Sequence, residues 1–151
     1  LKKQYAQDLS TSFQPVSPDQ IVVISAQIES ELAALPVTDQ RLYLDELGVA
    51  LSGLERLAEV AYRTLKLQSF LTAGKLEVKA WTIHQGTCAV EAAGVIHTDF
   101  IKKFIKAKVI DYDQFVKYQG WTKAKEAGKV RLEGRDYLMR PDDVVEFVIG
   151  G

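Results

Sequence analysis

Four consecutive β-branched residues at positions 21–24, with the sequence IVVI, constrain the fold of this chain more than any other feature. A run that is apolar on both faces is typical of a parallel strand buried between two layers of helices. We therefore predict a strand over residues 20–25. Such a strand needs neighbours, and the residues around it supply none. The chain also begins at Leu1 and has its only methionine at Met139. We therefore expect the rest of this sheet to lie upstream, in a longer protein of which the chain is a fragment.

Helical spacing dominates the rest of the first half. Apolar residues recur at intervals of three and four over residues 1–12, over 28–47 with an interruption at Pro36, and over 54–65. Ser52 precedes the last of these segments, in the position of a helix N-cap. The apolar stripe of that helix indicates packing against a sheet.

After Leu67 the pattern changes to short segments of alternating hydrophobicity. β-rich runs bounded by turn residues predict strands over residues 68–72, 78–84, 105–110, 130–132, 137–139 and 144–149. We expect the first two to form a hairpin around Ala73 and Gly74. Short helices are predicted over residues 88–93, 99–104 and 112–118. The second half should therefore be a small mixed sheet crossed by a helix.

Composition excludes several classes of protein. The longest apolar stretches are of strand length, far short of the roughly 20 residues of a membrane-spanning helix, so we expect no membrane protein. The single cysteine, Cys88, excludes an internal disulfide and a cysteine-rich zinc site. The two histidines, His84 and His97, are far apart in the sequence, and we expect no metal site.

Positive charge is concentrated in one window. Residues 102–131 contain nine Lys and Arg against three Asp and Glu, although the net charge of the whole chain is −1. A solvated, lysine-rich face explains such a window as well as a binding surface does. The functional interpretation is a surface for the phosphate backbone of RNA. The residues that we predict to contact phosphates are Lys102, Lys103, Lys106, Lys123, Lys125 and Arg131.

Two aromatic residues, Trp121 and His97, are candidates for binding or chemistry. Trp121 lies between Gly120 and Thr122 in the basic window, and it is a candidate stacking platform for a base. The alternative is that Trp121 covers a small hydrophobic core. His97 titrates near neutrality and precedes Asp99 by two residues, but no nucleophile motif accompanies it, so we predict no catalytic residue. Thr98 or Asp99 is more simply explained as the cap of a short helix.

Several passages resemble one known family. Residues 21–29, reading IVVISAQIE, look like the fifth guanine-nucleotide signature of P-loop GTPase-type domains, a strand followed by a Ser-Ala step. Three further segments are similar to the C-terminal domain of the Obg-like ATPase family, also called YchF. They are residues 74–83 (GKLEVKAWTI), 92–100 (AAGVIHTDF) and 123–139 (KAKEAGKVRLEGRDYLM), which occur in order and at the spacing of that family.

The resemblance implies an α+β chain of two unequal parts. Residues 1–65 resemble the terminal strand and helices of a P-loop α/β domain that binds nucleotides. Residues 66–151 resemble a TGS domain, a ubiquitin-like β-grasp module. Proteins of this family bind and hydrolyse ATP in preference to GTP, with Mg²⁺, associate with ribosomes, and are cytoplasmic. In related TGS domains the loop around His97 and Thr98 resembles a contact surface for RNA or protein, so both residues are candidates for recognition.

The chain departs from the family pattern at the nucleotide site. No G-x-x-x-x-G-K-[ST] motif occurs in its 151 residues, so the backbone nest and the lysine that would hold the phosphates are absent from this sequence. Only Ser25 and Ala26 correspond to nucleotide-site positions, where backbone amides would meet the base. ATP and Mg²⁺ are therefore expected in the parent protein, and no cofactor is expected for this chain alone.

Two functions of different classes follow from these observations. The first is a ribosome- or RNA-binding module within a larger ATPase. The second is a protein-interaction or regulatory domain without nucleotide hydrolysis, because the TGS modules that this chain resembles also occur beside synthetase and alarmone-metabolising domains, where they serve recognition or signalling. The Ser-Ala step before the module favours the ATPase parent. An independent hydrolase built on His97 and Asp99 is disfavoured, because no nucleophile or set of metal ligands surrounds them in the sequence.

Overall fold

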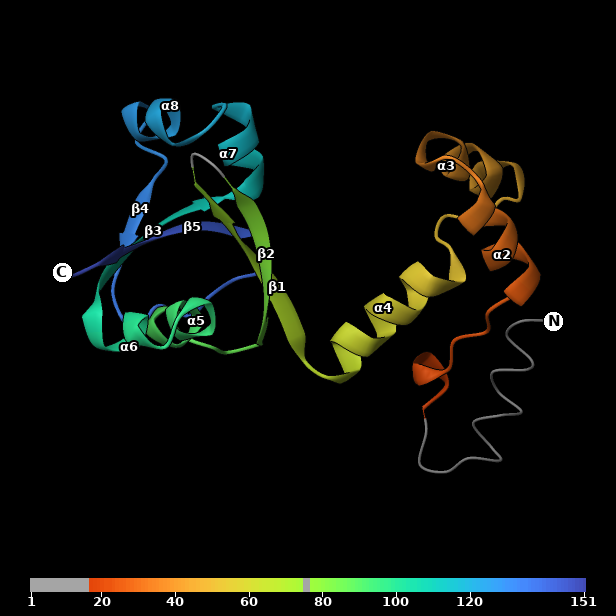
Figure 1. Cartoon of the computed structure of the whole chain (residues 1–151), viewed down its shortest axis with the longest axis horizontal. Coiled ribbons are helices and arrows are strands. Elements are labelled where there is room, and N and C mark those ends of the chain that lie inside the picture. Colours follow the sequence, from red (N-terminus) through yellow and green to blue (C-terminus); the bar gives the residue numbers. More distant parts are fainter. Residues whose placement is uncertain (1–16, 75–76) are drawn as a thin grey trace. The chain divides into compact units, whose positions relative to one another are not determined.

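The computed structural model describes residues 17–74 and 77–151 (Figure 1). The chain divides into two compact units, with the boundary between Leu65 and Lys66. The helix predicted over residues 1–12 lies outside the described residues. Within the described residues, no helix combines the length and the hydrophobicity needed to cross a lipid bilayer.

The first unit, where it is described, is helical. A 3₁₀ turn, η1 (Pro18–Gln20), is followed by α2 (Ala26–Ala34), α3 (Val37–Glu46) and α4 (Gly53–Thr64). Pro36 separates α2 from α3 because proline fixes φ and has no N–H to donate. Gly48 follows α3 with a φ of +66°, the left-handed conformation that ends many helices.

Helix α4 begins with a reciprocal cap. The Ser52 hydroxyl accepts a hydrogen bond from the Glu55 N–H at 3.1 Å, and the Glu55 carboxylate accepts one from the Ser52 N–H at 2.7 Å. Both bonds satisfy N–H groups that have no partner inside the helix. The prediction of a helix capped by Ser52 is confirmed, as is the interrupted helical segment over residues 28–47.

The prediction of a strand over residues 20–25 is wrong. The backbone there is extended, with φ of −98° at Ile21 and −96° at Ser25, but none of the described residues pairs with it in a sheet. Instead, the Arg56 guanidinium donates a hydrogen bond to the Val23 carbonyl oxygen at 2.7 Å. An extended segment becomes a strand only where its N–H and C=O groups meet those of a neighbour. The β-branched run favours the extended conformation but cannot provide the partner.

The apolar stripe of α4 does not pack against a sheet in this unit. Leu54 and Leu57 are 59% and 45% exposed, and no residue of α4 is buried. The helix is instead tied to η1, since the Arg63 guanidinium donates to the Asp19 carbonyl oxygen at 2.8 Å and lies 3.7 Å from its carboxylate. The expectation of a sheet beneath this stripe is wrong for the described part of the first unit, because that part contains no strand.

The second unit is a mixed α+β fold built on one five-stranded sheet (Figure 1). Its strands are β1 (Leu67–Ala73), β2 (Val78–His84), β3 (Phe104–Asp111), β4 (Arg131–Glu133) and β5 (Asp143–Ile149). Its helices are α5 (Ala89–Ile96), α6 (Asp99–Lys103), α7 (Tyr112–Lys117) and α8 (Trp121–Glu126). The predicted strand over residues 137–139 is reduced to a single bridge between Leu138 and Cys88, and the sequence did not predict α8.

The strand order is β2-β1-β5-β3-β4. Strands β1 and β2 form the predicted hairpin, with seven consecutive antiparallel pairs from Leu67↔His84 to Ala73↔Val78. The last strand, β5, lies in the middle, parallel to β1 and antiparallel to β3. Strand β4 pairs only with residues 107–109 of β3, so the first residues of β3 lie beyond its reach.

Helices cover both faces of this sheet. Helix α5 packs its alanines, among them Ala89 and Ala93, against Phe70 and Val109 in the larger core cluster. Helices α7 and α8 lie on the opposite face (Figure 1), where Ala124 joins Ile110 in a second cluster. Because side chains alternate between the two faces of a strand, neighbours such as Val109 and Ile110 serve different clusters.

Hydrogen exchange should separate the two kinds of extended backbone. The Val109 amide belongs to a central strand paired on both sides and is fully buried, so we expect exchange limited by opening of the whole unit. The Val22 amide lies in extended backbone without a paired strand, and we expect it to exchange many times faster. Strong protection at Val22 equal to that at Val109 would show that the 20–25 segment is paired after all.

Candidate nucleic-acid interface

Three lysines gather where α6 runs into β3, and we call this set the β3 corner: Lys102, Lys103 and Lys106. Lys102 and Lys103 form the last turn of α6 and are exposed. Cations at a helix C-terminus are favoured by the helix dipole, so the local fold stabilises both charges there. Lys106 follows a bulge at the start of β3.

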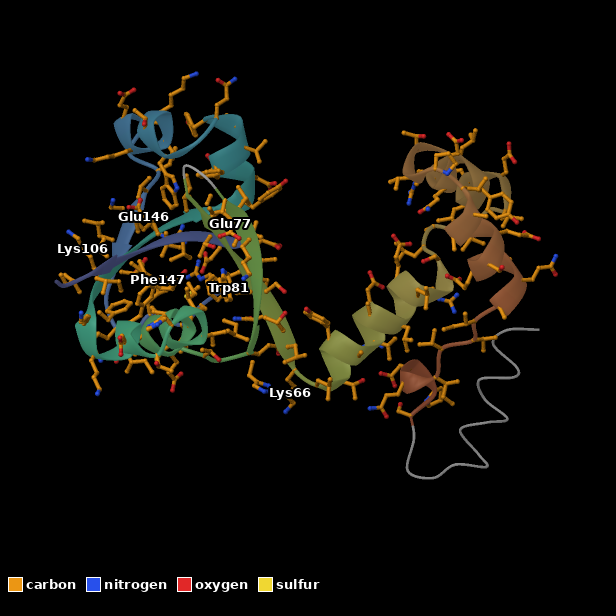
Figure 2. The ribbon with its side chains drawn as sticks, in the orientation of Figure 1. Lys66, Glu77, Trp81, Lys106, Glu146 and Phe147 are labelled. Atoms are coloured by element: carbon orange, nitrogen blue, oxygen red, sulfur yellow. The ribbon has the colours of Figure 1, made fainter. Side chains whose placement is uncertain are left out.

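The side chain of Lys106 lies on the face of the sheet opposite α5. Its neighbour Ala107 is buried in the larger core, and successive side chains of a strand point to opposite faces. Figure 2 shows Lys106 on the same side of the sheet as Glu146, with Phe147 and Trp81 on the other side. Because β4 does not reach residues 104–106, the corner is an open end of the sheet with cations around it.

Arg135 belongs to the same surface, although the basic window of the sequence stops before it. Its guanidinium donates hydrogen bonds to the carbonyl oxygens of Ile101 at 3.1 Å and Phe104 at 3.4 Å, and it lies 5.7 Å from the Phe104 ring. These contacts fix α6 against the start of β3. A sequence signal existed, since Arg135 lies in the segment that carried the family resemblance, but charge counting alone did not include it.

Lys123 and Lys125 form a second basic group on α8. Both are exposed, and the Lys123 ammonium group donates to the Gln119 side-chain oxygen at 2.6 Å. Helix α8 covers the face of the sheet away from α5 (Figure 1), whereas α6 packs beside α5. The predicted phosphate contacts therefore fall into two groups, and the structure does not bring all of them together.

Trp121 begins α8 and is partly buried. Its indole N–H donates to the Ala73 carbonyl oxygen at 2.8 Å, and its ring meets the Phe115 ring edge-on with 5.3 Å between centroids. These contacts agree with the alternative that Trp121 covers the second core. The ring also lines an open hollow of about 470 Å³ together with Thr122, Lys125 and Glu126. A base could reach only the part of the ring that borders this hollow.

Among the predicted phosphate contacts, Arg131 has the charge most fully compensated by carboxylates within the fold. Its guanidinium lies 3.2 Å from Asp111, 3.4 Å from Glu133 and 3.4 Å from Asp143. Burial alone would lower the pKa of Arg131, but its hydrogen bonds with Tyr137 and Asp111 raise that pKa above its ordinary value. Three carboxylates offset one guanidinium, so Arg131 offers little net positive charge to a phosphate.

Asp143 is the buried centre of this network, with 1% of its surface exposed. Its carboxylate accepts hydrogen bonds at 2.9 Å from both the Arg140 N–H and the Tyr137 hydroxyl. Burial raises the pKa of Asp143, and the hydrogen bond from the Arg140 N–H acts in the opposite direction. Burial also raises the pKa of Tyr137. The network ties β4 and the residues after it to β5.

His97 and Thr98 lie in the exposed turn between α5 and α6. Thr98 occupies the N-cap position of α6, as predicted, but its side chain makes no cap hydrogen bond. That hydrogen bond comes from His97, whose Nδ1 accepts the Asp99 N–H at 3.2 Å. The His97 ring also packs against Phe100, with 5.7 Å between ring centroids. These contacts give His97 a structural role, and part of its ring remains exposed to solvent.

Ser25 and Ala26, the two nucleotide-site positions of the sequence, start α2. The Ser25 hydroxyl accepts the Ile28 N–H at 3.4 Å, which makes Ser25 the N-cap. The cavity beside Ser25 has about 20 Å³, room for about one water molecule and not for a nucleotide. No group of three metal-binding side chains occurs within the described residues.

Comparison with known proteins shows that the chain is similar to members of one family. The family model YchF-GTPase_C, described as a protein of unknown function (DUF933), matches residues 67–149. Proteins named ribosome-binding ATPase YchF are similar in sequence. The one from Pasteurella multocida is 49% identical over 127 residues, which cover 84% of this chain and 35% of the relative. The one from Bacillus subtilis is 44% identical over 128 residues, 85% of this chain and 35% of the relative.

A solved structure is similar in fold. The YchF GTPase of Schizosaccharomyces pombe superposes with a TM-score of 0.80 and 28% sequence identity, over 96% of this chain and 38% of the yeast chain. The chain thus spans about a third of the length of the curated relatives that it matches.

Proposed function

Since this chain belongs to the YchF family and matches its C-terminal domain, we propose that it acts within a longer ribosome-associated ATPase, with residues 66–151 as the module that binds ribosome or RNA. The relatives are named for ribosome binding and ATPase activity, which supports both parts of the proposal. A cytoplasmic location follows from the same proposal. The observation that carries the binding role is the β3 corner, where Lys102 and Lys103 are exposed and Lys106 is partly exposed at an open end of the sheet.

We propose further that the second unit is a TGS-type β-grasp domain. The first and last strands lie side by side and parallel in the centre of the sheet, and α5 crosses one face between the β1–β2 hairpin and β3. This order supports the β-grasp assignment of residues 66–151. We assign residues 1–65 to the end of a P-loop nucleotide-binding domain, on the strength of the Ser-Ala step at Ser25 and Ala26.

The predicted phosphate contacts differ in how much uncompensated positive charge each can offer to a phosphate. Lys102, Lys103 and Lys106 present charges that no described carboxylate pairs with at salt-bridge distance, and Lys125 does the same on α8. Lys123 shares its ammonium group with Gln119, and Arg131 is held by carboxylates. Contacts to sugar or base would come from His97 and Thr98, in the turn before α6, and from Trp121, at the start of α8. Electrostatic contact with the phosphate backbone of RNA should therefore dominate binding, and we expect little sequence specificity.

Co-sedimentation with ribosomes tests the proposal. The chain should pellet with ribosomes at low ionic strength and dissociate as salt rises, because contacts to phosphate release counterions that salt opposes. Association that does not respond to salt would favour the protein-interaction alternative. No association at either salt concentration would refute the binding role of this module.

ATP chemistry belongs, in this proposal, to the longer protein. ATP with Mg²⁺ would bind through a P-loop, and this sequence contains none. We therefore expect the chain alone to show no tight ATP binding by calorimetry and no phosphate release above background. The cavity beside Ser25, of about 20 Å³, is likewise too small for a nucleotide. Micromolar ATP affinity or steady turnover by the purified chain would contradict this expectation.

A further inference from the structure

Strand β2 forms one outer edge of the sheet in the second unit. It pairs with β1 along its whole length, and among the described residues no strand pairs with its other side. The edge is also open to solvent, since Val78 is 70% exposed and Lys79 and Ala80 are exposed as well. Helix α5 contacts β2 only from the face that carries the core.

The hydrogen-bond pattern shows which residues of β2 point their backbone outward. The Gln85 N–H donates to the Lys66 carbonyl oxygen at 2.8 Å, and at the other end the Gly74 N–H donates to the Glu77 carbonyl oxygen at 2.9 Å. Antiparallel pairs alternate between bonded and non-bonded, so the odd-numbered residues of β2 bond to β1. Val78 and Ala80 therefore direct their N–H and C=O groups to the open side.

This edge lacks a bulge and a proline, two of the protections that edge strands usually carry. The register of the β1–β2 pairs runs through seven positions without a bulge, and the strand contains no proline. The opposite edge differs, because β4 has only three residues and two of them, Arg131 and Glu133, are charged. Exposed edges are normally shortened, bulged, charged or covered, because their unpaired groups template another strand.

We propose that β2 is a docking site at which an extended peptide segment of a partner protein adds a sixth strand to the sheet. The backbone groups of Val78 and Ala80 specify an extended partner, since another strand complements them. Lys79 adds a preference for an acidic side chain beside it, because opposite charges on neighbouring strands stabilise the pair.

A second copy of the chain fits this edge less well than a short peptide does. Seven residues of strand extend about 23 Å, and a ribbon of that length buries less than the roughly 1,200 Å² typical of stable interfaces. The pairing is therefore suited to a reversible contact with a peptide. Self-association is one outcome that the test must detect.

A synthetic peptide tests the site in the full chain. The probe copies β1, the strand that β2 already pairs with, and carries Glu at the position that faces Lys79: LQSFLEA. Fluorescence anisotropy of the labelled peptide measures binding, and amide shifts of Val78 and Ala80 report the place. Ala80→Pro removes the outward N–H without removing a bond to β1, which proline on an edge strand permits. We expect this variant to bind the probe at least about tenfold more weakly.

Two matched controls keep the result interpretable. Ala80→Val retains the N–H and should bind within about twofold of the original chain. A probe with N-methylated backbone amides has the same side chains but cannot pair, and should not bind, which tests the site without any protein variant. Circular dichroism checks that Ala80→Pro is folded. Equal binding by Ala80→Pro, binding of the N-methylated probe, absence of all binding, or self-association that Ala80→Pro abolishes would each overturn the proposal.

Discussion

Reversing the charge of Lys102 and Lys103 together is expected to weaken the binding of the chain to RNA of every sequence and to flatten its dependence on salt. Each contact with a single-strand phosphate contributes about −0.7 to the slope of log affinity against log salt. Four contacts give a slope of about −3, so raising salt from 50 to 200 mM should lower the affinity about fiftyfold. With two contacts removed, the same change in salt should lower it only about sevenfold. Filter binding across a salt series measures both slopes.

The control for this pair changes net charge by the same amount elsewhere. Lys117 and Lys129 are exposed lysines of the same basic window that lie outside the β3 corner. Their joint replacement by glutamate should leave the slope close to that of the original chain. Equal loss in both double variants would mean that overall charge, and not the β3 corner, determines binding. If no salt-sensitive association occurs, the lysines form a solvated face and the protein-interaction alternative becomes the better interpretation.

Asp143→Ala is expected to lower the free energy of unfolding of the second unit by about 3 kcal/mol, as measured by urea denaturation. The substitution leaves the Arg140 N–H, the Tyr137 hydroxyl and the Arg131 guanidinium without the acceptor that they share. Unmet polar groups in a buried position account for this loss more than the missing volume does. Asp143→Asn keeps the shape and one acceptor oxygen, and should lose less. Equal loss in the two variants would show that the network contributes little.

The burial of Asp143 also predicts that the free energy of unfolding depends on pH. Burial raises the pKa of Asp143 above its ordinary 3.8, so the folded state binds this proton more tightly than the unfolded chain does. The stability contributed by this group should therefore rise as pH falls from neutral through the raised pKa, and should level off below 3.8. The difference in unfolding free energy between the original chain and Asp143→Asn isolates this group. A difference that is constant across that pH range would contradict the assignment.

Much of the second unit could be predicted because its signals are local. Alternating runs and turn residues located β1, β2, β3 and β5, and the short helix predicted over residues 88–93 corresponds to α5. Helix α8 was missed because its residues, WTKAKE, lack an apolar stripe. The strand expected at residues 137–139 was reduced to a bridge.

The first unit shows the limit of the same reasoning. The run at residues 21–24 specifies extended backbone, and the structure has it, but pairing depends on residues distant in space. The stripe of α4 likewise specifies an apolar face without specifying what covers it. Its exposed leucines, such as Leu54, could be predicted to form one face of a helix but not to lie open.

The candidate site could be predicted only in part, for a related reason. Charge counting identified the lysines of the β3 corner, because it depends on the sequence alone. It could not separate them from Arg131, because Asp111, Glu133 and Asp143 approach that guanidinium only when β3, β4 and β5 assemble. Trp121 is similar, since the carbonyl oxygen that holds its indole belongs to Ala73, 48 residues away in sequence.

The central position of β5 has a consequence for how the second unit is made. Leu71 of β1 pairs with Val144, so the two halves of the sheet meet through the last of these five strands to be synthesised. During translation the β1–β2 hairpin and β3 have no common neighbour until residues 143–149 emerge. Contacts of such long sequence separation fold slowly, because the chain between them must be ordered first. The sheet of the nascent unit therefore stays incomplete through most of its synthesis. It is completed only when β5 pairs with β1 on one side and with β3 on the other.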